Sequence, residues 1–161
     1  MLIKTKQITI ILLIFVALVI PQTSNANNEK TEKLQLYYDH VYKIGVIEEL
    51  AGDLLNKYQH EIDNLVANEE AINQFRVLVA SFQDILKEHR RLEPPNKHIK
   101  LHHLFTDILE THIIGFKKLV LGLEQKKISY VNESFNIFET VNNDMDKADK
   151  IMGSISSVFQ K

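Results

Sequence analysis

The side chains in this sequence with the clearest capacity for chemistry are histidines. Four of the seven lie within residues 93–123: His98, His102, His103 and His112. His98 and His102 are four residues apart, so both rings can face one cation if this stretch is helical. Zinc or copper requires further ligands, and Glu93 or His89 could supply one across the intervening turn. His98 and His102 are therefore the candidate metal pair, and the alternative is a solvated rim at the start of a helix.

The other histidines form no comparable group. His103 points away from the apolar stripe of its segment, and His40 and His60 have no acidic or histidine cluster beside them, so we expect all three at the surface. No histidine has a glutamate three residues before it, which argues against the Glu-x-x-His pairs of di-iron bundles. A b-type haem held by His112 and a methionine, Met145 or Met152, is an alternative that no other feature of the sequence favours.

Three polar residues occupy positions where the apolar pattern predicts core, namely Glu48, His112 and Asn142. Counting from the predicted loops places His112 and Asn142 at one height in a helical bundle, with Gln83 near that level and Glu48 about one turn away. Because an unpaired buried polar group costs roughly 1–3 kcal/mol, these four residues predict a hydrogen-bonded layer. The layer is either a ligand or ion site or a means of fixing helix register, and polar residues in coiled-coil seams favour register.

Composition and missing motifs exclude several classes of function. A formal net charge of −2, without a long run of lysine and arginine, argues against nucleic-acid binding. The chain has no cysteine, which excludes disulfides, thiolate metal sites and a lipidated cysteine. It also has no glycine-rich phosphate loop, no G-x-S-x-G elbow and no H-E-x-x-H motif. We therefore expect a protein that is not an enzyme and that carries no cofactor.

The elements that must position these residues are helices. Four stretches carry apolar residues at alternating steps of three and four: residues 29–66, residues 69–90, the stretch from Pro94 and Pro95 to Leu123, and residues 129–158. Asn68 is the expected N-cap of the second helix, and Gly115 and Gly122 indicate either close backbone approach or simple tolerance. The low glycine and proline content supports an all-α fold. Short connections then predict an up-down-up-down four-helix bundle.

The N-terminal segment has the layout of an export signal. Lys4 and Lys6 precede an apolar run from Ile8 to Ile20, which is shorter than the roughly 20 residues that a membrane-spanning helix needs. Ser24-Asn25-Ala26 then supplies the small residues of a signal-peptidase site. A charged start, an apolar centre and a small-residue end in this order predict a secretory signal peptide.

This interpretation divides the chain into two parts. Residues 1–26 are the predicted signal peptide, cleaved after Ala26, and residues 27–161 are the predicted helical-bundle domain. The domain would then be secreted into the extracellular medium or held at the cell surface. The alternative is an uncleaved anchor in which residues 2–20 enter the membrane and the domain faces outside.

Residues 93–152 resemble a family of small exported all-helical proteins of low-GC Gram-positive bacteria, whose function is uncharacterised. The resemblance rests on a proline-led helix with an early histidine, here Pro94, Pro95 and His102, followed by a second amphipathic helix. It covers a little over a third of the chain. The resemblance implies export and an all-α fold, and it implies no activity.

Two functions fit these features. The first is a non-catalytic binding module at the cell surface or in the extracellular medium, with a protein or an envelope component as its partner. Its expected sign is an exposed aromatic patch at Tyr37, Tyr38 and Tyr42, although Tyr37 and Tyr38 could instead cover the edge of the core. The second is a small-ligand or divalent-metal binding protein that uses the histidine-bearing third helix.

Overall fold

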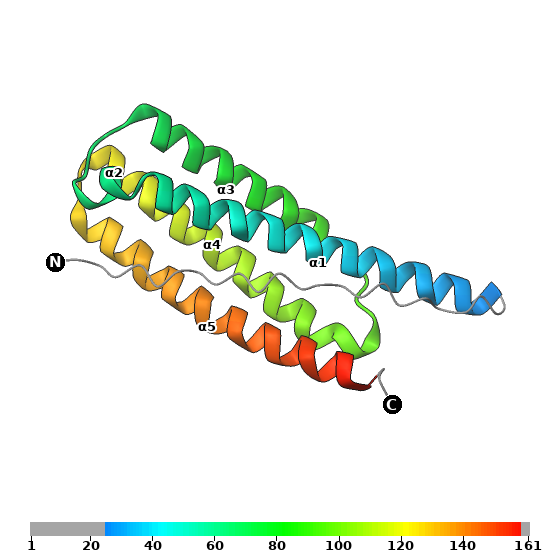
Figure 1. The fold of residues 1–161 in the computed structure, drawn as a ribbon. Helices are drawn as coiled ribbons and strands as arrows, with labels where there is room; N and C mark the ends of the chain where they lie inside the picture. The colour runs from blue at the N-terminus through cyan, green and yellow to red at the C-terminus, as the bar shows by residue number, and fades with distance from the viewer. Residues whose placement is uncertain (1–24, 159–161) are drawn as a thin grey trace.

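The regular structure of the protein is helical throughout the residues that the computed structural model describes, which are 25–158, with side chains for 31–155. The elements are α1 (Asn25–Lys57), α2 (Gln59–Asp63), α3 (Glu69–His89), the 3-10 turn η1 (Asn96–His98), α4 (Ile99–Gln125) and α5 (Ile128–Val158). Figure 1 shows the four long helices side by side, with the short α2 at one end. The all-α class predicted from the apolar spacing is confirmed.

The prediction of one continuous helix over residues 29–66 is wrong, because the helix is interrupted near its end. Tyr58 separates α1 from α2 with φ −106° and ψ 20°, outside the α-helical values. Its ring is buried, and its hydroxyl donates to Glu70 Oε1 at 2.8 Å. Leu65 then adopts a positive φ of 51°, which ends the helical path before α3. The glycines of α1 are not the point of interruption, because Gly45 and Gly52 both lie inside the helix.

Asn68 is the N-cap of α3, as the sequence predicted. Its side-chain oxygen accepts hydrogen bonds from the backbone N–H groups of Glu70 at 2.9 Å and Ala71 at 3.3 Å. These are two of the donors that have no partner inside the first turn of a helix. Glu69 and Glu70 add negative charge to that turn, where the helix dipole favours it.

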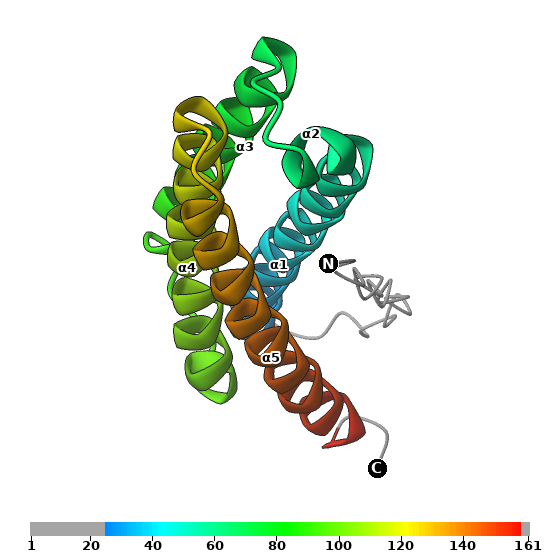
Figure 2. The ribbon, with the colours of Figure 1, turned by 90° about the vertical axis from the view of Figure 1, so that its left-hand side faces the viewer.

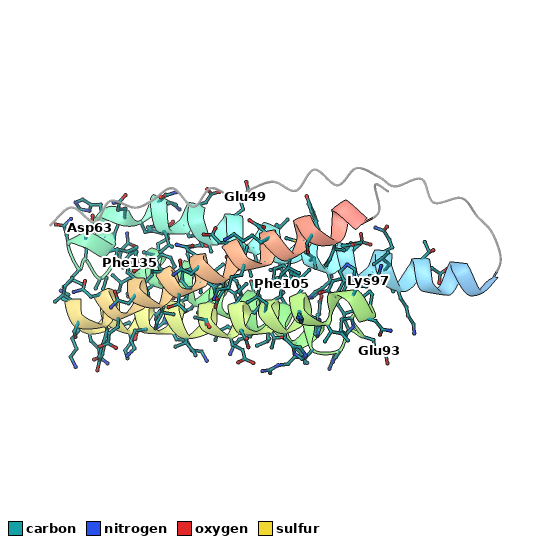
Figure 3. The ribbon with its side chains drawn as sticks, turned by 90° about the horizontal axis from the view of Figure 1, so that it is seen from below. Glu49, Asp63, Glu93, Lys97, Phe105 and Phe135 are labelled. Carbon is teal, nitrogen blue, oxygen red and sulfur yellow. The ribbon has the colours of Figure 1, made fainter. Side chains whose placement is uncertain are left out.

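Buried apolar side chains of α1, α3, α4 and α5 form one core, and α1 packs mainly on α3 (Figure 2). Phe116 of α4 stacks against Phe75 and Phe82 of α3, with ring centroids 6.0 Å and 5.8 Å away. Phe105 is also buried between the helices, whereas Glu49 and Glu93 lie on the outer faces (Figure 3). The apolar seam predicted for the third segment therefore faces inward. Of the seam predicted for the fourth segment, Val131 and Phe138 are buried, Phe135 is only partly buried, and Ile128 and Asn142 are exposed.

Two glycines allow α4 and α5 to approach closely. A Cβ added at Gly115 would lie 2.5 Å from Phe138 Cε1, and one at Gly122 would lie 2.8 Å from Val131 Cγ2. At Gly122 the backbone nitrogen of Val131 is also only 3.0 Å from that position. Of the two interpretations of these glycines, the structure therefore supports close backbone approach.

Candidate functional site

Four histidines are buried together where α1, the end of α3, η1 and the start of α4 meet. We call them the histidine cluster: His40, His89, His98 and His102. Their exposed fractions are 4%, 0%, 2% and 9% in that order. Histidine is seldom so fully buried in such numbers, and each ring must place two nitrogens. The cluster is therefore the most unusual chemical feature of the described residues.

His89 lies at the centre of the cluster. Its ring stacks on His102, with centroids 3.9 Å apart and planes 25° apart, and on His40, with centroids 5.1 Å apart and planes 19° apart. His89 Nε2 is 2.9 Å from the backbone carbonyl oxygen of His102. Because a carbonyl can only accept, Nε2 carries the proton, and Nδ1 is the unprotonated nitrogen of the neutral ring.

Two tyrosines of α1 complete the cluster. The Tyr38 hydroxyl is 2.9 Å from His98 Nε2, and the two rings meet edge to face. Tyr37 is fully buried, with its ring centroid 5.4 Å from that of His98 and 6.0 Å from that of His102. Tyr37 and Tyr38 therefore cover the core, and of the three predicted patch residues only Tyr42 is largely exposed.

The cluster contains buried polar atoms that have no hydrogen-bond partner among the described residues. They are the Tyr37 hydroxyl, His40 Nε2, and the Nδ1 atoms of His89, His98 and His102. A neutral ring tolerates a bare nitrogen, but a protonated ring would bury an N–H group without an acceptor. The neutral form is therefore the one that this environment favours.

Burial lowers the pKa of every histidine in the cluster. The pKa of His102 falls to about 4, first through desolvation and then through its neighbours His89 and His103. Desolvation is also the main cause for His40, His89 and His98. Glu88 partly opposes the shift at His40, as does the carbonyl hydrogen bond at His89. Burial likewise raises the pKa values of the two tyrosines.

The predicted metal pair lies in this cluster, but the rings are not arranged around one point. His89 and His102 are stacked, so their in-plane lone pairs run side by side and do not converge on one ion. Within residues 25–158, no three His, Cys, Asp or Glu side chains are placed to hold a metal ion. The alternative prediction of a solvated rim is wrong, because His98 and His102 are both buried. The structure therefore places these two residues in a packed aromatic cluster.

His40 also corrects the sequence analysis, which placed it at the surface. It is buried because it lies seven and fourteen residues before Ile47 and Leu54, which are buried on the same face of α1. That spacing could have predicted the burial of His40, but the polarity of histidine favoured a surface position. His60 and His103 are exposed, as predicted.

A second buried polar contact lies further along α1. Glu48 and His112 are each 6% exposed, and Glu48 Oε1 is 2.9 Å from His112 Nδ1. The two atoms lie at ion-pair distance, but neither forms a hydrogen bond. The His112 ring stacks on Phe82, with centroids 4.8 Å apart. This pair joins α1 to α4, which is the kind of contact expected if the predicted layer sets helix register.

The other two members of the predicted layer are not in the core. Asn142 and Gln83 are exposed, so neither can join Glu48 and His112. On α5, Ser134 and Val141 are among the buried residues, each one position before the predicted Phe135 and Asn142. Ser134 can occupy the core because its hydroxyl donates to the Val131 carbonyl at 2.7 Å. On α3, Phe82 takes the inward position and turns Gln83 toward solvent.

An apolar groove runs along the surface between α1 and α3. It has a volume of about 330 Å³ and is lined by Tyr42, Lys43, Val46, Ile47, Leu50, Ser81 and Ile85. Tyr42, Val46 and Leu50 are 62%, 49% and 47% exposed, and they follow one another at steps of four along one ridge of α1. At one end of the groove, Lys43 Nζ lies 3.0 Å from Glu88 Oε2, and His40 Nδ1 lies 3.7 Å from the same oxygen. The groove therefore ends beside the histidine cluster.

Of the helices described, none combines the length and the apolar character that crossing a membrane requires. Comparison of the chain with protein-family models, with curated protein sequences and with solved structures finds no match.

Proposed function

We propose that the protein is an exported, non-catalytic, up-down-up-down four-helix bundle that binds an amphipathic helix of a partner protein at the cell surface. The observation that carries this proposal is the apolar groove between α1 and α3. Contiguous exposed apolar side chains are uncommon on proteins that act alone, and they often indicate a surface that meets another molecule.

The alternation of helix direction is supported by contacts between neighbouring helices. Lys43 and Lys57 of α1 pair with Glu88 and Glu70 of α3, respectively, so the two helices are antiparallel. Two ion pairs, Arg76–Glu124 and Arg90–Glu110, give the same reversal between α3 and α4. The reversal between α4 and α5 is supported by the contacts of Gly115 with Phe138 and of Gly122 with Val131. Four alternating helices are the arrangement that short connections favour.

The dimensions of the groove support a helical ligand. The ridge from Tyr42 to Leu50 covers nine residues, which is about 12 Å along a helix axis from the first Cα to the last. A helix that places apolar side chains at positions i, i+4 and i+7 would lay them between this ridge and Ile85 of α3. Ser81 is the one small polar residue that lines the groove, so apolar anchors would supply most of the contact.

A synthetic helix tests this proposal directly. The probe is a fluorescent amphipathic peptide with leucine at i, i+4, i+7 and i+11 and with glutamate and lysine elsewhere, and its anisotropy is followed as protein is added. We expect saturable binding that weakens at least tenfold in Val46→Glu, because a charge would then lie in the apolar contact. Ile114→Glu is the matched control, since Ile114 is an exposed apolar residue of α4. Absence of saturable binding, or an equal loss in the control, contradicts the proposal.

Export is tested separately. The apolar segment Ile8–Ile20 and the small residues that end at Ala26 support cleavage after Ala26. N-terminal sequencing of the protein recovered from culture fluid should therefore begin at Asn27. A chain recovered only from membranes with its first residues intact would support the uncleaved anchor instead.

A further inference from the structure

We infer that the histidine cluster is a pH-dependent contact, which holds α1 on α3 and α4 while its rings are neutral and releases α1 when they are protonated. This goes beyond the proposed binding function, because it concerns how the bundle itself responds to acid. It follows from where the four rings lie, from which helices they join, and from the charges around them.

The rings of the histidine cluster join α1 to two other helices. His40 of α1 stacks on His89 of α3, and His89 stacks on His102 of α4. Tyr38 of α1 meets His98 in η1 through the 2.9 Å contact between its hydroxyl and Nε2. The rings of Tyr37, Tyr38 and His40 thus join α1 to η1, α3 and α4 beside the apolar contacts of Val41 and Ile44, whereas α3, α4 and α5 are joined by apolar and glycine contacts.

A protonated ring in the cluster would find few partners to stabilise its added N–H group and its charge. The nitrogen that would gain a proton at His89 is the buried Nδ1, which has no acceptor among the described residues. The Nδ1 atoms of His98 and His102 are likewise buried without a partner there. Stacked imidazolium rings would also repel each other, since the His89 and His102 centroids are only 3.9 Å apart. Separation of the helices would expose these nitrogens to water and relieve both costs.

Charged side chains from several elements face the rings of the histidine cluster. Glu88 of α3 is the carboxylate nearest to His40, at 3.7 Å, and Lys43 of α1 shares it at 3.0 Å. Lys97 and His103 add positive charge beside His98 and His102. At the same end of the bundle, Lys33 pairs with Glu93 at 3.6 Å, Arg91 lies near Glu88, and α5 contributes the partly buried Asp149 beside Asp146. One shared carboxylate cannot balance four imidazolium rings.

The direction of the effect follows from proton binding. Burial lowers the pKa of each cluster histidine below its ordinary value of 6.5, so the open form binds more protons than the closed form below that pH. Each further unit by which the pH falls raises the equilibrium constant for opening about tenfold per histidine, until the pH reaches the pKa of that histidine in the closed form. The contact is therefore strong at neutral pH and weakens as the pH falls from about 6.5 toward 4.

Spin-label distances measure this opening without any ligand. The chain has no cysteine, so Leu36→Cys on α1 and Lys100→Cys on α4 give one defined pair of labels at exposed positions. Lys100→Cys with Lys150→Cys on α5 gives a reference pair within the remaining helices. Between about pH 7.5 and pH 5, with a chelator present, we expect at least a tenfold rise in the population with a long α1–α4 distance. The reference distance should stay constant.

Matched variants separate the cluster from other titrating groups. The double variant His89→Gln with His102→Gln removes two titrating rings, and it should lose most of the acid opening. His60→Gln is the control, because His60 is exposed and distant in sequence from the cluster, and it should open like the wild type. If the double variant does not fold at neutral pH, His40→Gln alone must reduce the pH effect.

Four outcomes overturn the inference. The α1–α4 distance could remain unchanged down to about pH 4.5, below the ordinary histidine pKa. The double variant, or His40→Gln in its place, could open as fully as the wild type. His60→Gln could abolish the opening, or both label pairs could lengthen together, which would indicate global unfolding. Opening would also dismantle the groove, and only that consequence rests on the proposed function, because the distances are measured without peptide.

Discussion

His89 and His102 are joined in two ways, because their rings stack with centroids 3.9 Å apart and His89 Nε2 donates to the backbone carbonyl of His102. The hydrogen bond fixes the tautomer of His89. The stacking places its ring against the ring of His102, and the two rings would repel each other if both were charged. This pair links the last turn of α3 to the first turn of α4, on either side of the connection that contains Pro94 and Pro95. The neutral state of these two side chains therefore contributes to how α3 and α4 meet.

The free energy of unfolding should decrease on acidification between about pH 6.5 and pH 4.5. The unfolded chain binds protons at histidines whose pKa values are lowered in the folded state, so the unfolded form gains with every step of acidification in this range. The lowered pKa values of Glu70 and Glu88 act only at lower pH, near the ordinary range of glutamate. Urea unfolding followed by circular dichroism should give a lower midpoint at pH 5.5 than at pH 7.5. An equal or higher midpoint at pH 5.5 would contradict this account.

Gly122→Ala should destabilise the protein by about 1–2 kcal/mol, because the new methyl group would meet both the side chain and the backbone of Val131. Gly45→Ala is the matched control, since a Cβ there has nothing within 4 Å. Alanine is the better helix former, so the control should stabilise by up to about 1 kcal/mol. Thermal melts of both variants measure the difference, and a pair of shifts with the same sign would count against close approach at Gly122.

Asn68→Ala should cost about 1 kcal/mol, because the backbone N–H groups of Glu70 and Ala71 would lose their acceptor. Asn143→Ala on α5 is the control, since Asn143 is exposed within the helix. The two variants remove the same side chain, so the difference between their unfolding free energies measures the cap together with the hydrogen bond that Asn68 Nδ2 donates to Glu61 Oε1. A difference close to zero would show that Asn68 does not stabilise the start of α3.

Glu48 and His112 should show strong energetic coupling. Glu48→Leu alone leaves the buried His112 ring without the carboxylate that lies 2.9 Å from its Nδ1, and we expect a loss of about 3 kcal/mol. The double variant Glu48→Leu with His112→Phe replaces both groups by apolar ones, and its loss should be clearly smaller than the sum of the single losses. Urea unfolding of the two single variants and the double variant completes the cycle. Additive losses would show that the 2.9 Å contact contributes little.

The helical fold could be predicted from the sequence because it depends on local patterns. Apolar spacing located the long helices, and the position of Asn68 located the start of α3 within a residue. The exact face of each helix was harder to predict. Ser134 and Val141 are buried on α5 where Phe135 and Asn142 were expected, because a serine that bonds to its own helix can occupy the core.

The histidine cluster could be predicted only in part. The spacing of His98 and His102 showed that two rings share a face, but not whether that face meets metal, solvent or other side chains. His40 is separated from His102 by 62 residues, and both contact His89 only because α1 packs on α3 at one particular height. Such a height depends on contacts along the whole length of two helices, so no local pattern specifies it. The heptad relation of His40 to Ile47 was the usable signal.

The most direct measurement is the protonation state of the cluster, by nitrogen NMR of the histidine rings at about pH 6, where an ordinary histidine is mostly charged. The account predicts that His89 and His102 are neutral at that pH and that His89 carries its proton on Nε2. Rings of His89 and His102 that are charged at pH 6 while α1 remains packed on α3 would contradict it.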